Sequence, residues 1–302
     1  MSEKRIVISG GSGLVGRALT EALLAAGYRV AWLTRSPQAV AGVECICWDV
    51  NSGQIPPESL AGAFAVVHLA GAPVAQRWTA RARKEILNSR VQTARILTDA
   101  IEALPAADRP AAFLGGSAIG WYGESEAWQD ETAPVGEGFL AEVVEQWEAA
   151  EARAAASGVR TSIVRTGLVL SSGGGMLGKL LPLYRLGLGS PVGSGRQWQS
   201  WIHIDDLVRL FVHLIEDPEL HGVFNGVAPS PVRQAELSRE LARALHRPHI
   251  LPKVPRWALW LAFGEMSQTI CASQKIEPRA TLESGFEFQH PELQGALENL
   301  FG

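Results

Sequence analysis

The first half of the chain alternates short apolar runs with longer stretches in which apolar residues recur at helical spacing. The runs are typical of buried parallel strands and cover residues 6–8, 28–33, 43–48, 64–69, 111–114 and 160–165. The helical stretches cover residues 80–103, 139–156, 205–216 and 234–246, and a last one starts at Pro291. This alternation implies right-handed β-α-β crossovers. It predicts an α/β fold of the Rossmann type, a doubly wound parallel sheet with helices on both faces.

Glycines follow the first run at a spacing that suits a bound diphosphate. Gly10 permits a tight turn off the strand, Gly13 removes a Cβ that would block a pyrophosphate, and Gly16 lets the helix pack closely on the sheet. Leu14 and Val15 open that helix with Gly16, so their N–H groups and the positive end of the helix dipole would face the anion. A glycine-rich turn without ligand is the alternative. The position between strand and helix favours dinucleotide binding.

A second group of polar residues ends the next run, at Thr34-Arg35-Ser36. In an NAD site an acidic residue about 20 positions beyond the glycines accepts the ribose 2′-hydroxyl, whereas an arginine suits the 2′-phosphate of NADP. The planar guanidinium of Arg35 can pair bidentately with a phosphate, and Thr34 and Ser36 add hydroxyl donors. A solvated surface arginine is the alternative interpretation. The place of Arg35 in the turn favours NADP(H) as the cofactor.

Beyond the sixth run the alternation gives way to glycine-rich stretches at residues 171–175 and 187–195. In a compact protein such stretches are more often binding loops than flexible linkers. We therefore expect an NADP(H)-binding domain over residues 1–170, with its sheet completed by later segments. A smaller substrate-side lobe would cover residues 171–302.

Composition narrows the range of partners. The chain has 302 residues, 47% of them hydrophobic, which is enough for a sizeable core. A formal net charge of −4 and a pI near 6.0 provide no basic field for nucleic acid or anionic lipid. No apolar stretch is long enough to span a bilayer, and the first strand begins too near the N-terminus to leave room for a signal peptide. We expect a cytoplasmic protein that binds a small-molecule substrate and could form a homodimer.

Cysteine and histidine spacing gives no sign of a disulfide framework or a metal site. Cys45 and Cys47 lie two positions apart on one strand, and Cys271 makes the set odd. The seven histidines show no His-x-x-x-His pattern. We therefore predict no metal.

Several segments together resemble the extended short-chain dehydrogenases/reductases, the group of nucleotide-sugar epimerases and dehydratases. The resemblance begins at Ser9–Gly16, which is similar to the family's T-G-x-x-G-x-x-G, and continues at Asp49, which resembles its adenine-binding aspartate. His68-Leu69-Ala70-Gly71 resembles the turn after the fourth strand, and implies that Leu69, Ala70 and Gly71 contact the cofactor.

The second half of the chain extends this resemblance. Ser117 with Tyr122-Gly123 resembles the family's serine strand and Tyr-Gly pair, with one residue more between them, and Trp201–Asp206 resembles its Ile-His-Val-Asp-Asp segment. The run Gly-Ser-Gly-Arg-Gln-Trp-Gln-Ser-Trp-Ile-His and the Trp- and Pro-containing tail are similar to an uncharacterised epimerase-like subgroup of atypical members. That subgroup implies a small C-terminal module of unknown function from about Leu251.

The chain departs from the family at its catalytic pair. Family members use Tyr-x-x-x-Lys, in which the lysine lowers the pKa of the phenol so that it acts as a general base. The residues four positions after Tyr28, Tyr122 and Tyr184 are tryptophan, glutamate and leucine, so the pair is absent. Phe139 or Glu137 falls where the tyrosine would stand. The standard mechanism therefore cannot be carried over.

Other residues are candidates for the missing chemistry. Ser117 could donate to a substrate carbonyl or cap a turn, and Tyr122 could donate a proton or form a wall of the pocket. Arg165 and Arg196 would suit an anionic substrate, with surface solubility as the competing explanation. His203 is either a substrate contact or a buried structural histidine. We predict Ser117 and Tyr122 as catalytic residues and the other three as substrate-binding residues.

Two functions from different classes remain. The first is an NADP(H)-dependent oxidoreductase or epimerase of nonstandard mechanism, acting on an anionic or nucleotide-sugar-like substrate. The second is a noncatalytic protein that binds or senses NADP(H). The intact glycine turn favours the first function, and the missing Tyr-x-x-x-Lys favours the second.

Overall fold

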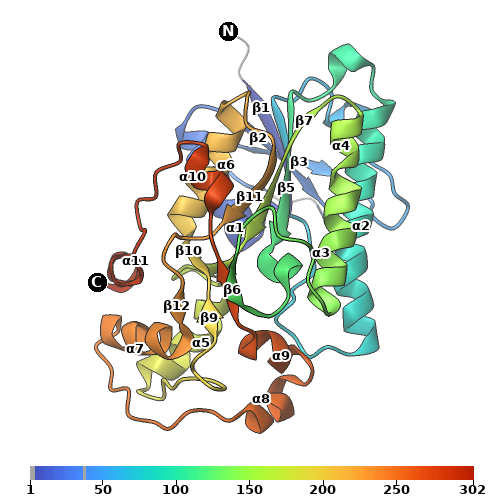
Figure 1. The fold of residues 1–302 in the computed structure, drawn as a ribbon. Coiled ribbons are helices and arrows are strands. Elements are labelled where there is room, and N and C mark those ends of the chain that lie inside the picture. The colour runs from blue at the N-terminus through green and yellow to red at the C-terminus, as the bar shows by residue number, and fades with distance from the viewer. Residues whose placement is uncertain (1–3, 37–38) are drawn as a thin grey trace.

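A seven-stranded parallel sheet forms the centre of the computed structural model, which describes residues 4–36 and 39–302 (Figure 1). Its spatial order is β11 (Gly222–Gly226), β7 (Arg160–Thr166), β5 (Ala112–Ala118), β4 (Ala65–His68), β1 (Arg5–Ser9), β2 (Arg29–Thr34) and β3 (Val43–Cys47). Every neighbouring pair is parallel. The order reverses between β1 and β4, which is where open sheets of this kind bind ligands. The predicted doubly wound sheet is confirmed.

Helices cover both faces of this sheet. One face carries α1 (Leu14–Ala25) and α6 (Ile204–Glu216), and the other carries α2 (Ala80–Ala103), α3 (Phe139–Glu151) and α4 (Arg153–Ala156) (Figure 1). The period-2 alternation of β1 explains the two layers. Ile6 and Ile8 enter the core beneath α1 and α6, whereas Val7 enters the core beneath α2.

The sheet extends past the boundary expected near residue 170. Both α6 and β11 come later in the chain, and β11 adds the outermost strand beside β7. Residues 204–226 therefore belong to the larger packed unit.

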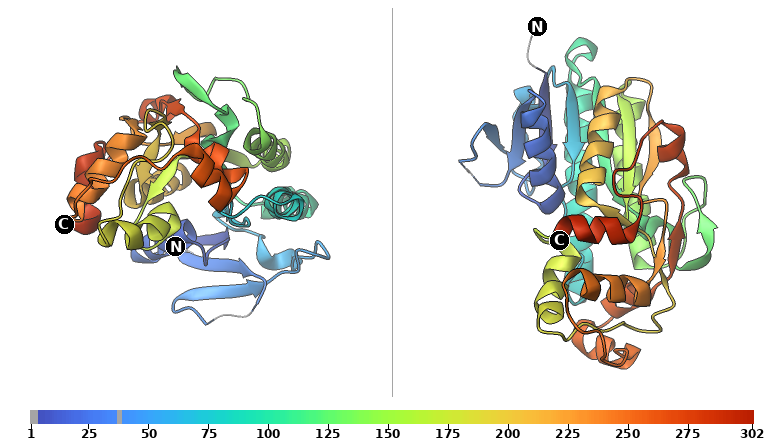
Figure 2. Two further views of the ribbon diagram at one scale, coloured as in Figure 1. Left: turned by 90° about the horizontal axis from the view of Figure 1, so that it is seen from below. Right: turned by 90° about the vertical axis from the view of Figure 1, so that its left-hand side faces the viewer.

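The smaller lobe lies beyond the carboxyl ends of the strands, at the bottom of Figure 1 and facing the viewer in the left panel of Figure 2. Its core is formed by α5 (Gly175–Arg185), α7 (Gln234–Ala244) and α11 (Leu293–Phe301), packed around the buried Trp201. The short pairs β8 (Leu168–Leu170) with β10 (Trp201–His203) and β9 (Trp198–Gln199) with β12 (Val232–Arg233) connect it to the sheet. The helix α5, between the two glycine-rich stretches, was not predicted.

The C-terminal region is tied to the larger unit at several points. It contains α8 (Arg256–Phe263), α9 (Met266–Cys271), β13 (Gln274–Ile276) and α10 (Arg279–Glu283). β13 pairs in parallel with β6 (Ser125–Gln129), and Phe286 enters the core beneath α6. The Asp206 carboxylate accepts hydrogen bonds of 2.8 Å from the backbone N–H groups of Gln289 and His290. Across residues 4–36 and 39–302, none of the helices has the length and apolar character needed to cross a membrane.

Candidate functional site

The glycine turn leaves open space in front of α1. Gly10 has φ +78°, and a Cβ there would lie 2.6 Å from the Leu69 carbonyl oxygen. A Cβ at Gly16 would lie 2.4 Å from the Gly10 carbonyl oxygen, so these two glycines allow close backbone packing. At Gly13 the nearest atom is the Gly10 carbonyl oxygen at 3.2 Å. Gly13 therefore keeps clear the space that a pyrophosphate would occupy.

The start of α1 is available to bind an anion. Gly13 is its N-cap and makes no side-chain capping bond, so the N–H groups of Leu14, Val15 and Gly16 lie at an open helix terminus. The glycine-rich loop that precedes α5 lies over this point, because a Cβ at Gly175 would approach the Leu14 side chain to 3.1 Å. One of the two predicted binding loops therefore reaches the cofactor cradle.

Arg35 and Asp49 line one groove of about 900 Å³ at the ends of β2 and β3. Arg35 is exposed, whereas the Thr34 hydroxyl donates to the Ser36 carbonyl oxygen at 2.8 Å and so stabilises the turn. Hydrogen bonds from Ser52 and from the Asn51 N–H lower the pKa of the exposed Asp49 carboxyl. The groove brings together the two residues expected at the adenosine end of the cofactor.

Arg90 on α2 is a cofactor-site candidate that the sequence analysis missed. Its guanidinium lies beneath Gly71, where an added Cβ would approach Cζ to 2.9 Å, and 5.2 Å from the centre of the Trp147 ring. Nη1 donates to the carbonyl oxygens of Ala72 and Ile86, both at 3.0 Å. Burial lowers the pKa of Arg90 to about 10, so the group remains a cation at neutral pH. It places a positive charge beside the predicted Leu69–Gly71 cofactor turn.

A buried pair, His68 and Glu151, lies at the end of β4. His68 Nδ1 and Glu151 Oε1 are 2.6 Å apart, and His68 Nε2 lies 2.8 Å from the Thr93 hydroxyl. Gly115 provides the room, since a Cβ there would lie 2.1 Å from Glu151 Oε2. Burial raises the pKa of Glu151 and lowers that of His68 to about 3. Both shifts favour the neutral forms, and the hydrogen bonds of the pair join α2, α3 and β4.

Ser117, Tyr122 and Arg165 meet in a single buried network around Glu148. Arg165 Nε and Nη2 each donate to the Glu148 carboxylate at 2.8 Å, and the Ser117 hydroxyl donates to Glu148 Oε1 at 2.5 Å. The Tyr122 hydroxyl accepts from Arg165 Nη1 at 3.1 Å and donates to Asn225 Oδ1 at 2.7 Å. Each of the three predicted site residues thus has a polar protein partner.

Burial limits what this network can offer a substrate. Tyr122 is 2% exposed and Arg165 3% exposed, and burial raises the pKa of Tyr122 to about 12. The Arg165 charge is balanced by the two oxygens of Glu148, and its guanidinium lies 3.9 Å from the centre of the Trp121 ring. These contacts support a structural function for Arg165 in place of the predicted substrate contact.

A second pocket, of about 400 Å³, lies between the start of α3 and the C-terminal region. Phe139 lines it, at one of the two positions expected for the family's tyrosine. Trp78 packs edge-on against Phe139 with ring centres 5.0 Å apart, and the Arg83 guanidinium lies 4.3 Å from the Phe139 ring centre. Arg83 also pairs with Glu265 of the C-terminal region at 2.8 Å. The C-terminal region therefore forms one wall of this pocket.

Arg196 and His203 lie outside the lining of this pocket. Arg196 is exposed in its loop, and its backbone N–H donates to the Ser194 hydroxyl at 3.0 Å. His203 is 1% exposed and caps α6, because its Nδ1 accepts from the Asp205 N–H at 3.1 Å. Its placement fits the structural alternative considered for this histidine.

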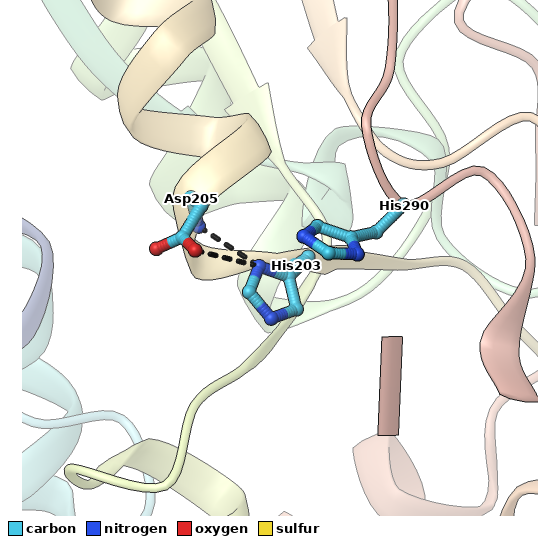
Figure 3. Close-up of side chains that lie close together, drawn as sticks. All are labelled: His203, Asp205 and His290. Carbon is cyan, nitrogen blue, oxygen red and sulfur yellow. Dashed lines mark hydrogen bonds and ion pairs between the residues drawn. The ribbon is translucent and has the colours of Figure 1, made fainter. Parts of the chain in front are cut away.

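His203 also lies beside a distant histidine that sequence spacing could not reveal. The rings of His203 and His290 have centres 4.0 Å apart, with the Asp205 carboxylate 3.7 Å from His203 Nδ1 (Figure 3). One potential ligand atom from each of the three residues falls within 4.8 Å of the others. Nδ1 already accepts the Asp205 N–H, so a cation at this atom would displace the cap of α6. Burial and the neighbouring His290 lower the pKa of His203.

Comparison with known proteins agrees with the fold described above. The NAD dependent epimerase/dehydratase family matches residues 6–225. The chain belongs to this family. A domain of unknown function, DUF1731, matches residues 254–300, in agreement with the C-terminal module expected from about residue 251.

Relatives extend over almost the whole chain. The human epimerase family protein SDR39U1 is 37% identical over 98% of this chain and 99% of its own length, and a chloroplastic homologue from Arabidopsis thaliana is 38% identical over 98% and 86%. The crystal structure of human SDR39U1 with NADPH has a TM-score of 0.89, with 98% of each chain covered. A nucleoside-diphosphate sugar epimerase from Corynebacterium glutamicum has a TM-score of 0.79 at 31% identity, covering all of this chain and 59% of that one.

Proposed function

We propose that this protein is an NADP(H)-dependent oxidoreductase of the epimerase family that reduces a carbonyl group on a small molecule. The single observation that carries the proposal is the arrangement at this edge of the sheet, where Arg35 and Asp49 line one groove and the open glycine turn follows β1, the parallel neighbour of β2. The related human SDR39U1, crystallised with NADPH, supports the same cofactor.

Different residues would contact different parts of the cofactor. Arg35 would pair with the 2′-phosphate, and the N–H groups that open α1 would hold the pyrophosphate. Arg90 would face the part of the cofactor that passes the Leu69–Gly71 turn. When bound, the cofactor supplies the hydride, and the chain's residues provide orientation and charge.

The substrate would enter the 400 Å³ pocket beside Phe139. Phe139 cannot donate a proton, and the Tyr122 hydroxyl is already bonded to Asn225. We therefore propose that Ser117 and Tyr122 act as positioning residues that fix the end of β5. The proton for the product alkoxide would come from solvent or from a polar group of the pocket.

A noncatalytic NADP(H)-binding protein is the second candidate. It is favoured by Phe139 and Val143 at positions that Tyr-x-x-x-Lys would occupy. Both functions require binding of NADP(H), but only the reductase converts a substrate.

The test begins with calorimetric titration of NADPH and NADH, for which we expect tighter binding of NADPH. NADPH oxidation is then followed at its absorbance band with a broad panel of aldehydes, ketones and keto-sugars. Oxidation that depends on one carbonyl compound would establish the reductase. Binding without oxidation across the panel would establish the noncatalytic function, and absence of NADPH binding would contradict both.

A further inference from the structure

The pocket beside Phe139 has a net negative charge. Its lining includes three carboxylates, from Glu124, Glu137 and Glu265, and one guanidinium, from Arg83. Arg83 and Glu265 neutralise one another through their 2.8 Å ion pair. Glu124 and Glu137 are exposed and carry the remaining charge, so the pocket has a formal charge of about −2 at neutral pH.

The other lining groups are suited to a polar ring. Trp78 and Phe139 present two aromatic surfaces that pack edge-to-face, and the polar side chains of Gln268, Thr269 and Gln274 come from the C-terminal region. Gln274 is held in place by its Nε2, which donates to carbonyl oxygens of the segment that precedes β6. Aromatic walls with amide and hydroxyl groups offer both stacking and hydrogen bonding to a hydroxylated molecule.

The N-terminus of α3 also borders the pocket, and its helix dipole contributes a partial positive charge. A helix N-terminus carries about half a positive charge. That is too small to balance two carboxylates, and Glu142 in the first turn of α3 opposes it further. The sum of these charges therefore repels an anion.

We propose that the part of the substrate that enters this pocket is a hydroxylated or amine-bearing group with no carboxylate or phosphate. This inference rests on the proposed function, because it names the substrate class for the same reductase site. It replaces the anionic substrate expected from sequence, since Arg165 is bound to Glu148 and Arg196 lies elsewhere. Any phosphate of a larger substrate would have to remain outside the pocket.

The charge can be measured without knowing the substrate. Thr269→Cys would place a thiol in the pocket of a protein that also carries Cys45→Ser and Cys47→Ser, leaving the buried Cys271. Rates of modification by a cationic and an anionic methanethiosulfonate are compared, each normalised to a small free thiol. We expect the normalised ratio to favour the cationic reagent roughly tenfold or more. The ratio should fall toward one with Glu124→Gln and Glu137→Gln, but not with Glu21→Gln and Glu145→Gln, which alter exposed carboxylates outside the pocket.

Ligand preference is then tested on the NADPH-loaded protein with matched sugars. In saturation-transfer NMR, glucosamine should give a signal and glucuronate should not, with the difference lost in the Glu124→Gln, Glu137→Gln protein. A normalised thiosulfonate ratio at or below one would overturn the proposal, as would sugar signals that are equal or both absent. NADPH titration of the same proteins reports separately on the proposed function, because failure there leaves the thiosulfonate ratio unchanged.

Discussion

Arg165 and Glu148 form a buried bidentate ion pair, with Nε and Nη2 of the arginine each 2.8 Å from a carboxylate oxygen. The pair joins β7 to α3 and gives the Tyr122 hydroxyl its donor. Because both charges are removed from water, loss of either partner leaves the other uncompensated. The network therefore holds the ends of β5 and β7 and the start of the segment that borders the pocket beside Phe139.

Tyr122→Phe should destabilise the protein without weakening cofactor binding. The substitution leaves Arg165 Nη1 and Asn225 Oδ1 without their shared hydroxyl, which should cost roughly 1–3 kcal/mol of unfolding free energy. Urea unfolding measures the loss, and calorimetry should give an unchanged NADPH affinity. Once a carbonyl substrate is known, a large fall in kcat at full stability would instead identify Tyr122 as the proton donor.

Arg35→Ala should weaken NADPH binding selectively. Loss of a guanidinium paired with the 2′-phosphate should cost about 1.5–3 kcal/mol, or roughly tenfold to a hundredfold in Kd, while NADH affinity stays the same. Titration calorimetry with both cofactors gives the two changes. Equal losses would show that Arg35 does not read the phosphate.

Arg90→Met should weaken NADPH and NADH equally, because the residue lies beside the Leu69–Gly71 turn and far from Arg35 in the chain. The expected loss is roughly tenfold, typical of one hydrogen bond to a charged group. Arg95→Met is the matched control, since it removes the same charge from an exposed position on α2. Unchanged Kd values for Arg90→Met would assign the guanidinium to the packing of Ala72 and Trp147 alone.

Gly13→Val and Gly16→Val should separate binding from folding. At Gly13 the side chain would extend into the open space before α1 and exclude the pyrophosphate, so the protein should fold and fail to bind NADPH. At Gly16 the Cβ would lie 2.4 Å from the Gly10 carbonyl oxygen, so the protein itself should be destabilised. Thermal unfolding and calorimetry distinguish the two losses. Wild-type NADPH affinity in Gly13→Val would contradict the cradle.

Glu151→Gln should alter the dependence of stability on pH. Burial raises the pKa of Glu151 above 4.5, so its contribution is complete below that value and is lost as pH rises toward the raised pKa. Burial lowers the pKa of His68 from 6.5 to about 3, so its contribution is complete above 6.5 and is lost as pH falls toward 3. The two slopes are therefore opposite in sign, and the slope from Glu151 runs from pH 4.5 up to its raised pKa.

As pH rises from 4.5 toward the raised pKa of Glu151, the unfolding free energy of the wild type should therefore decline relative to that of Glu151→Gln, whose amide can still donate to His68 Nδ1. Urea titrations across this range of pH measure the difference. Glu145→Gln, at an exposed position on the same helix, should follow the wild type. Parallel profiles for wild type and Glu151→Gln would contradict a neutral Glu151.

Local patterns in the sequence were sufficient for six of the seven strands of the sheet and for the glycine turn that follows β1. The helix over residues 80–103 was predicted with the observed bounds, because Thr79 caps its start and its apolar spacing is regular. The glycine turn and Arg35 could be recognised because they are adjacent in the chain to the strands that position them. Such features need no knowledge of distant contacts.

The pocket beside Phe139 could not be predicted in the same way. Phe139 and Glu265 are far apart in the chain, and both line the pocket because the C-terminal region is held there by contacts such as the β13–β6 pairing and the Arg83–Glu265 ion pair. Arg90 belongs to no recognisable sequence motif. Its guanidinium fits against Gly71 because glycine has no Cβ, and this contact appears only in the folded chain. Ser117 and Arg165 were singled out for their chemistry, whereas their partner Glu148 was not among the predicted residues. The Glu148 carboxylate is buried because α3 packs against β5 and β7, and a local sequence pattern does not reveal this packing.

The region that matches DUF1731 cannot be exchanged independently of the rest of the chain. The same stretch of chain contributes Glu265 to the pocket wall, Phe286 to the hydrophobic core under α6, and the backbone of His290 to the carboxylate of Asp206. A transplanted tail with a different pocket wall would therefore have to reproduce the core contacts of this chain as well. Chimaeras joined near residue 254 should therefore lose solubility unless these contacts are kept.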